Sequence, residues 1–167
     1  MRVEKGSFVT VFLEAENVHC YKDVGMIPRT LSKEFGCRSY LVCRGAGQYD
    51  LFEDLNLIKL GGGSAQAEIK LLSFLCANAK NIKVLNLYHW GRHTYTVGRL
   101  YKFLNPAGKL YVKCDLDDRG LCVIKQNADA QKIFAKIAAM ADLISCESTR
   151  IAEELNRLIE SRVEWVP

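Results

Sequence analysis

The run Phe8-Val9-Thr10-Val11-Phe12-Leu13 lies near the start of the chain and is almost wholly apolar, β-branched or aromatic. Such a run is typical of a strand buried on both faces, as the strands of parallel sheets are. Six shorter runs of similar character follow it along the chain. They predict strands at Ser39–Cys43, Leu57–Leu60, Val84–Tyr88, Leu110–Val112, Leu143–Cys146 and Val163–Val166.

The intervals between these strands carry apolar residues at helical spacing. After the first strand, Val24, Ile27 and Leu31 belong to such a stripe, which Gly36 is suited to end. Comparable stripes predict helices over 64–79, 97–104, 130–141 and 151–159, with Ser64 and Ser148 as N-caps. Alternating strands and helices build a parallel sheet with helices on both faces. We therefore predict an α/β fold, a Rossmann-like three-layer α/β/α sandwich with a mainly parallel sheet.

The composition is that of one globular domain spanning residues 1–167, with 49% hydrophobic and 25% charged residues. No run of the ~18 apolar residues that a membrane-spanning helix needs is present. The N-terminus does not resemble a signal peptide. The seven cysteines are odd in number and include no Cys-x-x-Cys, so we expect no disulfide framework and a reducing, cytoplasmic location.

The net charge is only +4, but basic residues gather in one segment. Between His89 and Cys114 there is no acidic residue, and aromatic residues are interleaved with the cations Arg92, Arg99, Lys102, Lys109 and Lys113. A basic, aromatic stretch suits phosphate, nucleic acid or an anionic membrane surface. The same pattern also arises when one helix face is solvated beside buried aromatic residues, so both interpretations stay open.

Several common functions of α/β proteins lack their motifs here. The chain has no Gly-x-Gly-x-x-Gly for a dinucleotide, no Gly-Lys-Ser/Thr of a P-loop and no Gly-x-Ser-x-Gly of a hydrolase. Gly61-Gly62-Gly63-Ser64 stands where a response-regulator receiver would carry an aspartate. Ligands of open parallel sheets bind beyond the carboxyl ends of the strands, so we look for function in the loops that follow them.

The loop after the first strand is long and polar and leads into the first helix. Its candidate substrate-binding residues are His19, Lys22, Asp23 and Gly25. A helix N-terminus binds anions, Lys22 adds a positive charge, and Gly25 lets a ligand approach the backbone. The structural alternative is a capped loop in which Asp23 is the N-cap.

The loop after Val84–Tyr88 holds His89, Arg92 and His93, two of the three histidines of the chain among them. Histidine serves as an acid, a base or a ligand, and these side chains are candidates for polar contact with a substrate. No further Cys or His ligand pair lies nearby in the sequence, so we expect no metal here. A histidine that caps the following helix is the structural alternative.

The loop after Leu110–Val112 is rich in carboxylates, with Asp115, Asp117 and Asp118 close together. Carboxylates at a strand end hold a divalent metal or orient sugar hydroxyls. Asp-rich turns are also common for purely structural reasons. The sequence leaves open both the role of this group and which aspartate faces a ligand.

Five stretches of the sequence belong together: Glu16-Asn17-Val18-His19, Lys22-Asp23-Val24-Gly25-Met26-Ile27-Pro28, Leu85-Asn86-Leu87-Tyr88-His89, Leu104-Asn105-Pro106-Ala107-Gly108-Lys109 and Ala141-Asp142-Leu143-Ile144-Ser145. In this order they resemble the N-terminal, acceptor-side domain of bacterial glycosyltransferases with the two-domain GT-B fold, of the large retaining class called group 1. Together they cover most of the chain. The resemblance implies metal-free transfer of a sugar from a nucleotide sugar, a substrate rather than a cofactor, to an acceptor.

The resemblance also implies roles for individual residues. Lys22, Asp23 and Gly25 match the loop that approaches the donor phosphates and the acceptor. Asp115 or Asp117 takes the place of a residue near the reacting sugar, and we expect it to act there with His89 as a catalytic group. Ser148 matches a family serine that opens the helix after the sixth strand. The expected partners are a nucleotide sugar, a glycan or lipid-linked acceptor of cell-surface polysaccharide synthesis and an anionic membrane, but not nucleic acid.

The chain departs from the family pattern in three ways. The loop after the first strand lacks the family's frequent Gly-Gly, which puts its phosphate role in question. No two glutamates lie eight positions apart, as they do in the donor-binding C-terminal domain of the family. The sequence ends at Val166-Pro167, where the family continues with Asn-Gly into that second domain. We therefore expect half of an enzyme, inactive alone. The alternatives are a non-catalytic, flavodoxin-like binding or regulatory module and a metal-dependent transferase that uses Asp115 and Asp117.

Overall fold

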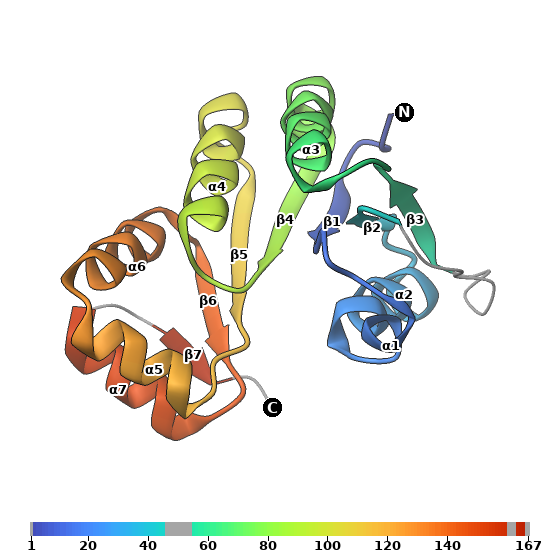
Figure 1. Ribbon diagram of the computed structural model, residues 1–167. Coiled ribbons are helices and arrows are strands. Elements are labelled where there is room, and N and C mark those ends of the chain that lie inside the picture. Colours follow the sequence, from blue (N-terminus) through green and yellow to red (C-terminus); the bar gives the residue numbers. More distant parts are fainter. Residues whose placement is uncertain (1, 46–54, 160–162, 166–167) are drawn as a thin grey trace.

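The computed structural model describes residues 2–45, 55–159 and 163–165 (Figure 1). The strands are β1 (Ser7–Val11), β2 (Ser39–Cys43), β3 (Asn56–Lys59), β4 (Ile82–Tyr88), β5 (Lys109–Cys114), β6 (Leu143–Cys146) and β7 (Val163–Trp165). The helices are α1 (Asn17–Cys20), α2 (Asp23–Phe35), α3 (Ser64–Asn78), α4 (Arg92–Leu104), α5 (Asp118–Gln126), α6 (Ala128–Met140) and α7 (Thr149–Ile159), with a 3-10 turn at Ala79–Asn81.

The described strands form one parallel sheet in the order β3-β2-β1-β4-β5-β6-β7. The chain builds outward from β1 to β3, crosses back, and then builds outward on the other side from β4 to β7. In the centre, Val9 of β1 lies between Tyr40 of β2 and Leu85 of β4. The predicted Rossmann-like α/β fold is thus confirmed, and its sheet is parallel throughout.

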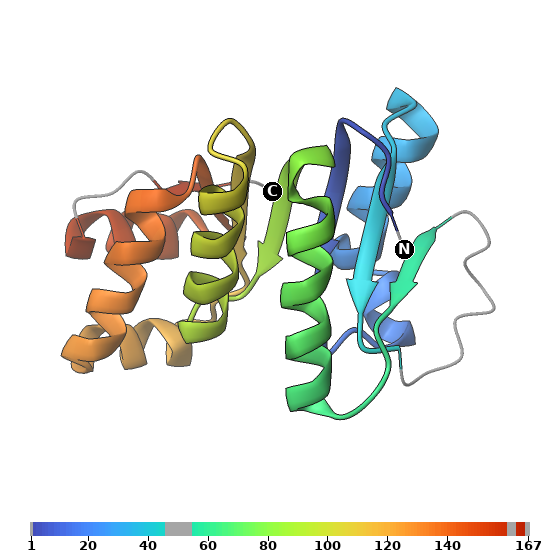
Figure 2. The ribbon, with the colours of Figure 1, turned by 90° about the horizontal axis from the view of Figure 1, so that it is seen from above.

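Helices cover the two faces of the sheet unequally. Figure 1 shows α1 and α2 on one side of β1 and β2, and Figure 2 shows α3, α4 and α6 side by side on the other. The larger core lies beneath α3 to α7 and includes the fully buried Tyr101 and Phe134. A smaller core under α1 and α2 contains Cys20, Val24 and Tyr88. No disulfide joins any of the seven cysteines, all of which lie among the described residues.

Some element boundaries differ from those expected. β1 ends at Val11 rather than Leu13, because the chain turns there and Ala15 N donates to Phe12 O at 3.1 Å. The short helices α1 and α5, of four and nine residues, were not predicted. Gly63 rather than Ser64 is the N-cap of α3. Val166, the expected end of the last strand, lies outside the described residues.

Among the described residues, no helix is both long enough and apolar enough to cross a bilayer.

Candidate functional site

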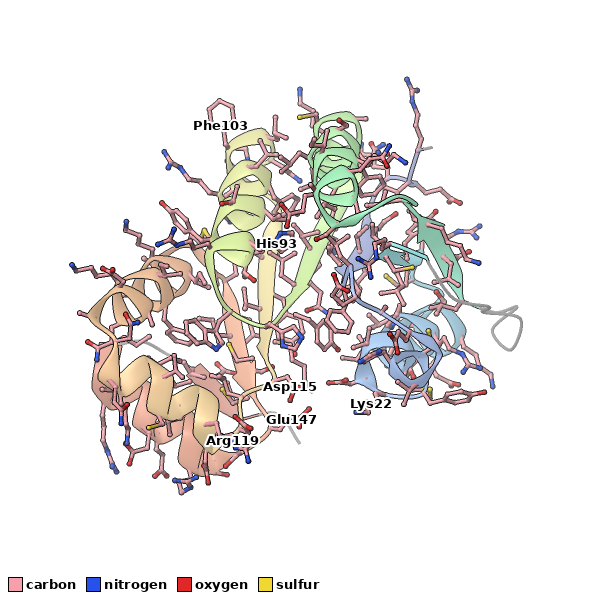
Figure 3. All side chains as sticks on the ribbon, in the orientation of Figure 1. Lys22, His93, Phe103, Asp115, Arg119 and Glu147 are labelled. Atoms are coloured by element: carbon pink, nitrogen blue, oxygen red, sulfur yellow. The ribbon has the colours of Figure 1, made fainter. Side chains whose placement is uncertain are left out.

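The loops that follow β1, β4, β5 and β6 meet at the carboxyl edge of the sheet, where the strand order reverses between β1 and β4. In Figure 3, Lys22 from the loop before α2 lies across from Asp115 after β5 and Glu147 after β6. Parallel sheets bind ligands at such a reversal, because the chains on its two sides diverge and leave a crevice. The topology therefore brings polar side chains from distant segments to one place.

A buried cation lies beneath this edge. The side chain of Lys113, on β5, is only 7% exposed, and its Nζ contacts Asp23 Oδ2 and lies 3.4 Å from Glu147 Oε1. Burial alone lowers the pKa of Lys113, but the hydrogen bond and charge of Asp23, together with Glu147, outweigh burial and raise it. Lys113 therefore stays charged and ties the first turn of α2 to β5 and to the loop after β6.

Tyr88, the last residue of β4, lies beside this ion pair and is 6% exposed. Burial, followed by the nearby charge of Asp23, raises the pKa of its hydroxyl, so the phenol stays neutral. Tyr88 is paired with Lys113 in the sheet register. Its neutral hydroxyl and the paired charges form a buried polar cluster beneath the carboxyl edge.

Phe12, directly after β1, lies at the centre of a cluster of rings from α1, from the end of β4 and from the loop after β4. Its ring centroid is 5.0 Å from that of His19, 5.1 Å from His89 and 5.7 Å from Tyr88. Edge contacts of this kind add to the hydrophobic stabilisation and fix ring orientation. Both histidines are thus held against one aromatic ring at the edge of the sheet.

His89 has a strained backbone, with φ of 64° in the left-handed region. Its conformation is held on both sides, because His89 N donates to Lys113 O at 2.9 Å and Thr94 Oγ1 donates to His89 O at 3.3 Å. A left-handed conformation outside glycine costs about 1 kcal/mol and is concentrated at functional sites. The strain therefore marks His89 as a candidate functional residue.

This strain predicts an unusual order of stability among variants. The variant His89→Gly should be more stable than His89→Ala by about 1 kcal/mol, because only glycine adopts this φ without strain. Both variants lose the ring contact with Phe12, so their comparison isolates the backbone. Urea denaturation of the two proteins measures the difference. A more stable alanine variant would contradict the left-handed conformation.

Two adjoining cavities open on the side of α3 and α4, and the first of them is bordered by His89. The first, of about 200 Å³, is lined by β1 and β4 residues, by Ser64 and Glu68 of α3 and by His93 of α4. The second, of about 270 Å³, shares Glu68 and His93 with it and continues between the two helices to Leu72. His93 Nδ1 lies 3.7 Å from Glu68 Oε1. Partial burial lowers the pKa of His93 despite the opposing charge of Glu68, so a neutral imidazole borders both cavities.

The residues predicted after β1 hold the local structure together. Lys22, not Asp23, is the N-cap of α2, and Lys22 O accepts from Met26 N at 2.8 Å. Asp23 is instead the first helical residue and the partner of Lys113. Gly25 is buried, and a Cβ there would lie 2.3 Å from Cys20 O, so Gly25 allows the close approach of α1 and α2.

His19, Arg92 and His93 differ in the contacts that their side chains make. His19 Nδ1 accepts from Glu16 N at 3.0 Å, which makes the histidine part of the cap of α1. Arg92 and His93 occupy the first turn of α4, and Arg92 is exposed. The histidine cap expected as the alternative for the loop after β4 does not occur there, because Gly91 is the N-cap of α4, and His93 lines the two cavities.

The two candidate aspartates after β5 differ in their surroundings. Asp117 is the N-cap of α5, and its Oδ1 accepts from Gly120 N at 2.8 Å. Asp115 is exposed directly after the strand and lies near Glu147 (Figure 3). Ser148 is half-buried before α7, and its carbonyl accepts from Ala152 N at 3.0 Å. Asp117 therefore has a structural role as a helix cap, whereas Asp115 is an exposed carboxylate at the end of β5.

Sequence reasoning missed four residues of this site. Lys113 was noted only as part of a basic stretch, although a lysine within an apolar strand signals a buried pair. Glu147, Glu68 and Phe12 gave no signal of their own, because their places depend on segments distant in the sequence. In the described part of the chain, no group of three or more His, Cys, Asp or Glu side chains is placed to hold a metal ion.

No protein-family model and no curated protein sequence matches this chain. Its structure does resemble solved ones. A protein from Listeria monocytogenes described as a UDP-N-acetylglucosamine 2-epimerase has a TM-score of 0.57 and 16% identity, over 92% of this chain and 41% of that one. An α-glucosyltransferase in complex with UDP and DNA has a TM-score of 0.55 and 13% identity, over 96% and 42%.

A third similar structure is the N-terminal domain of Candida albicans trehalose-6-phosphate phosphatase, with a TM-score of 0.60 and 11% identity, over 99% of this chain and 49% of that one. At sequence identities of 11–16%, the similarity supports a shared fold only. The chain therefore shares the Rossmann-like fold of these larger proteins, and it spans less than half of the length of each.

Proposed function

We propose that this chain is the acceptor-side, N-terminal domain of a retaining GT-B glycosyltransferase that transfers a sugar from a nucleotide sugar to a glycan or lipid-linked acceptor. The observation that supports this most is the polar carboxyl edge at the strand reversal, with Asp115, Glu147, His89 and the adjoining cavities. The fold similarity to larger proteins agrees with this proposal. One of them is an α-glucosyltransferase with bound UDP, and this chain covers less than half of its length. Cell-surface polysaccharide is the proposed product, and a lipid-linked acceptor would bring the domain to the cytoplasmic face of a membrane.

The proposed chemistry breaks the bond between the sugar C1 and the diphosphate oxygen and forms a bond from C1 to the acceptor oxygen. His89, at the strand end, takes the proton of the acceptor hydroxyl, and the nucleoside diphosphate leaves. Asp115 and Glu147 accept hydrogen bonds from sugar hydroxyls. Lys113, Asp23 and Tyr88 do not touch the substrate but hold this edge rigid, and orientation of this kind lowers the barrier to transfer.

The acceptor is proposed to enter through the paired cavities between α3 and α4. Their combined shape leads from the edge of the sheet to Leu72, past the neutral His93 and the carboxylate of Glu68. Neutral imidazole and carboxylate together both donate to and accept from hydroxyl groups. An acceptor with several hydroxyls, such as a glycan, fits this lining.

Titration of nucleotide and nucleotide sugar into the 167-residue chain tests whether donor binding and acceptor binding belong to different domains. UDP and UDP-glucose should bind weakly, with a Kd above about 1 mM, because the proposal assigns most donor contacts to a second domain that these 167 residues do not include. On a glycan array, the same chain should retain acceptor glycans. Micromolar binding of UDP-glucose, or an array with no bound glycan, would overturn the proposal and favour the flavodoxin-like module.

The two aspartates provide a matched pair of variants for the array. Asp115→Asn should lower glycan binding about tenfold, as loss of a hydrogen bond to a charged group does. Asp117→Asn should leave it unchanged, because asparagine is also a good N-cap and preserves α5. Equal behaviour of the two variants would remove Asp115 from the site.

A further inference from the structure

A hollowed surface formed by α4 and α6 lies on the side of the sheet opposite α2. We call it the α4–α6 surface and define it by Arg92, Tyr95, Arg99, Phe103, Lys132 and Lys136. One hollow of about 350 Å³ is lined by α4 residues from Tyr95 to Phe103, and a second of about 390 Å³ lies between α4 and α6. Tyr95 borders both, so the two hollows adjoin.

Apolar and aromatic side chains project from this surface. Phe103 is 80% exposed, more than any other large apolar side chain among the described residues. Tyr95, Arg99 and Phe103 are four residues apart and therefore share one face of α4. Figure 3 shows Phe103 at the far end of α4 from Asp115, Glu147 and Lys22.

The charge of the surface is strongly positive. Helix α4 contains no Asp or Glu, and Lys102 is neutralised by Asp142 at 3.1 Å. On α6, Lys132 lies 3.8 Å from Asp129, the one carboxylate that lines the hollows. Within residues 2–45, 55–159 and 163–165, no carboxylate pairs with Arg92, Arg99 or Lys136. Lys136 instead lies over the Tyr95 ring, 5.7 Å from its centroid.

We propose that the α4–α6 surface docks this protein onto an anionic lipid bilayer. Basic side chains near a membrane surface contribute about 1 kcal/mol each, and an aromatic side chain among them inserts at the headgroup level. The exposed Phe103 favours a bilayer over duplex nucleic acid, whose backbone phosphates are bound by cations without a protruding apolar group. Arg92 lies at the carboxyl edge of the sheet and Phe103 at the far end of α4. If both contact the bilayer, α4 lies along the membrane surface over its whole length. The candidate site then opens next to the membrane surface.

Vesicle flotation of the 167-residue chain tests this directly and needs no sugar donor. The protein should float with vesicles of phosphatidylcholine and phosphatidylglycerol at low salt, and added salt should release it. Pure phosphatidylcholine should retain little. Absence of binding to the anionic vesicles, equal binding to both compositions, or tighter binding to duplex DNA than to anionic vesicles at the same salt would overturn the proposal. None of these results bears on glycan binding.

Matched variants locate the surface. Neutralising Arg99→Gln and Lys136→Gln together should weaken vesicle binding about 25-fold, about fivefold for each charge. Phe103→Ala should weaken it about tenfold. The controls Lys33→Gln and Phe35→Ala lie on α2, across the sheet, where Phe35 is 74% exposed, and they should bind as the wild type does. Equal losses in the α2 controls would assign the interaction to another face.

Discussion

Replacing Lys113 by methionine should lower the free energy of unfolding by about 3–5 kcal/mol, as breaking a buried ion pair does. The methionine fills a similar volume but leaves the carboxylate of Asp23 in a poorly solvated place with no cation beside it. Because the pKa of Lys113 is raised in the folded protein, the pair stabilises the fold fully below the usual value of 10.5. Its contribution is lost only as the pH rises through the higher folded value.

Two comparisons isolate the pair in urea denaturation at neutral pH. Lys109→Met, on the same strand but with a 64% exposed side chain, should cost less than about 1 kcal/mol. The double variant Lys113→Met with Asp23→Asn should recover part of the loss, because no buried charge remains. A Lys113→Met protein as stable as Lys109→Met would show that the ion pair does not hold the edge of the sheet.

Replacing Gly25 by alanine should destabilise the protein by about 3 kcal/mol, at the upper end of the cost of overpacking. The new Cβ would meet Cys20 O at 2.3 Å and Cys20 Cα at 2.5 Å, and both are backbone atoms that move only if α1 moves. We expect the loss to show in chemical denaturation. Amide exchange should also quicken in α1 and the loop that carries Lys22, ahead of the rest of the protein.

Gly63 provides the control for this substitution. A Cβ there would have no neighbour within 4 Å, and its φ of −72° is one that alanine adopts. Gly63→Ala should therefore cost no more than about 1 kcal/mol, the cost of alanine at an N-cap. Similar effects at Gly25 and Gly63 would mean that the α1–α2 contact is not close-packed.

The parallel sheet was predictable because its strands are buried on both faces, which leaves runs such as Phe8–Leu13 in the sequence. The layered arrangement followed from the alternation of strands and helices along most of the chain. The helices α1 and α5 were missed because four and nine residues are too few to show a helical period. The N-caps of α2 and α3 were predicted one position late, at Asp23 and Ser64 instead of Lys22 and Gly63. The sequence alone does not show which of two neighbouring residues begins a helix.

The candidate site was predictable only as a set of loops. The carboxyl-edge rule located Asp115 and His89 in two of these loops. The geometry then separated Asp115 from Asp117, which a local backbone hydrogen bond engages as a helix cap. The partners Lys113 and Asp23 are ninety positions apart, and Glu68 meets His93 from another helix. Contacts of this kind depend on how the elements pack, and neither spacing nor composition reports them.

The central place of β1 and β4 in the sheet has a consequence for synthesis of the protein. Thr10 and Asn86 hydrogen-bond across these strands, although they lie 76 positions apart in the sequence. A nascent chain that carries β1 to β3 therefore exposes the inner edge of β1 until β4 leaves the ribosome. Closing so long a loop is slow, and an open strand edge invites pairing with other chains. We expect the first sixty residues to be the aggregation-prone part of this protein during its own translation.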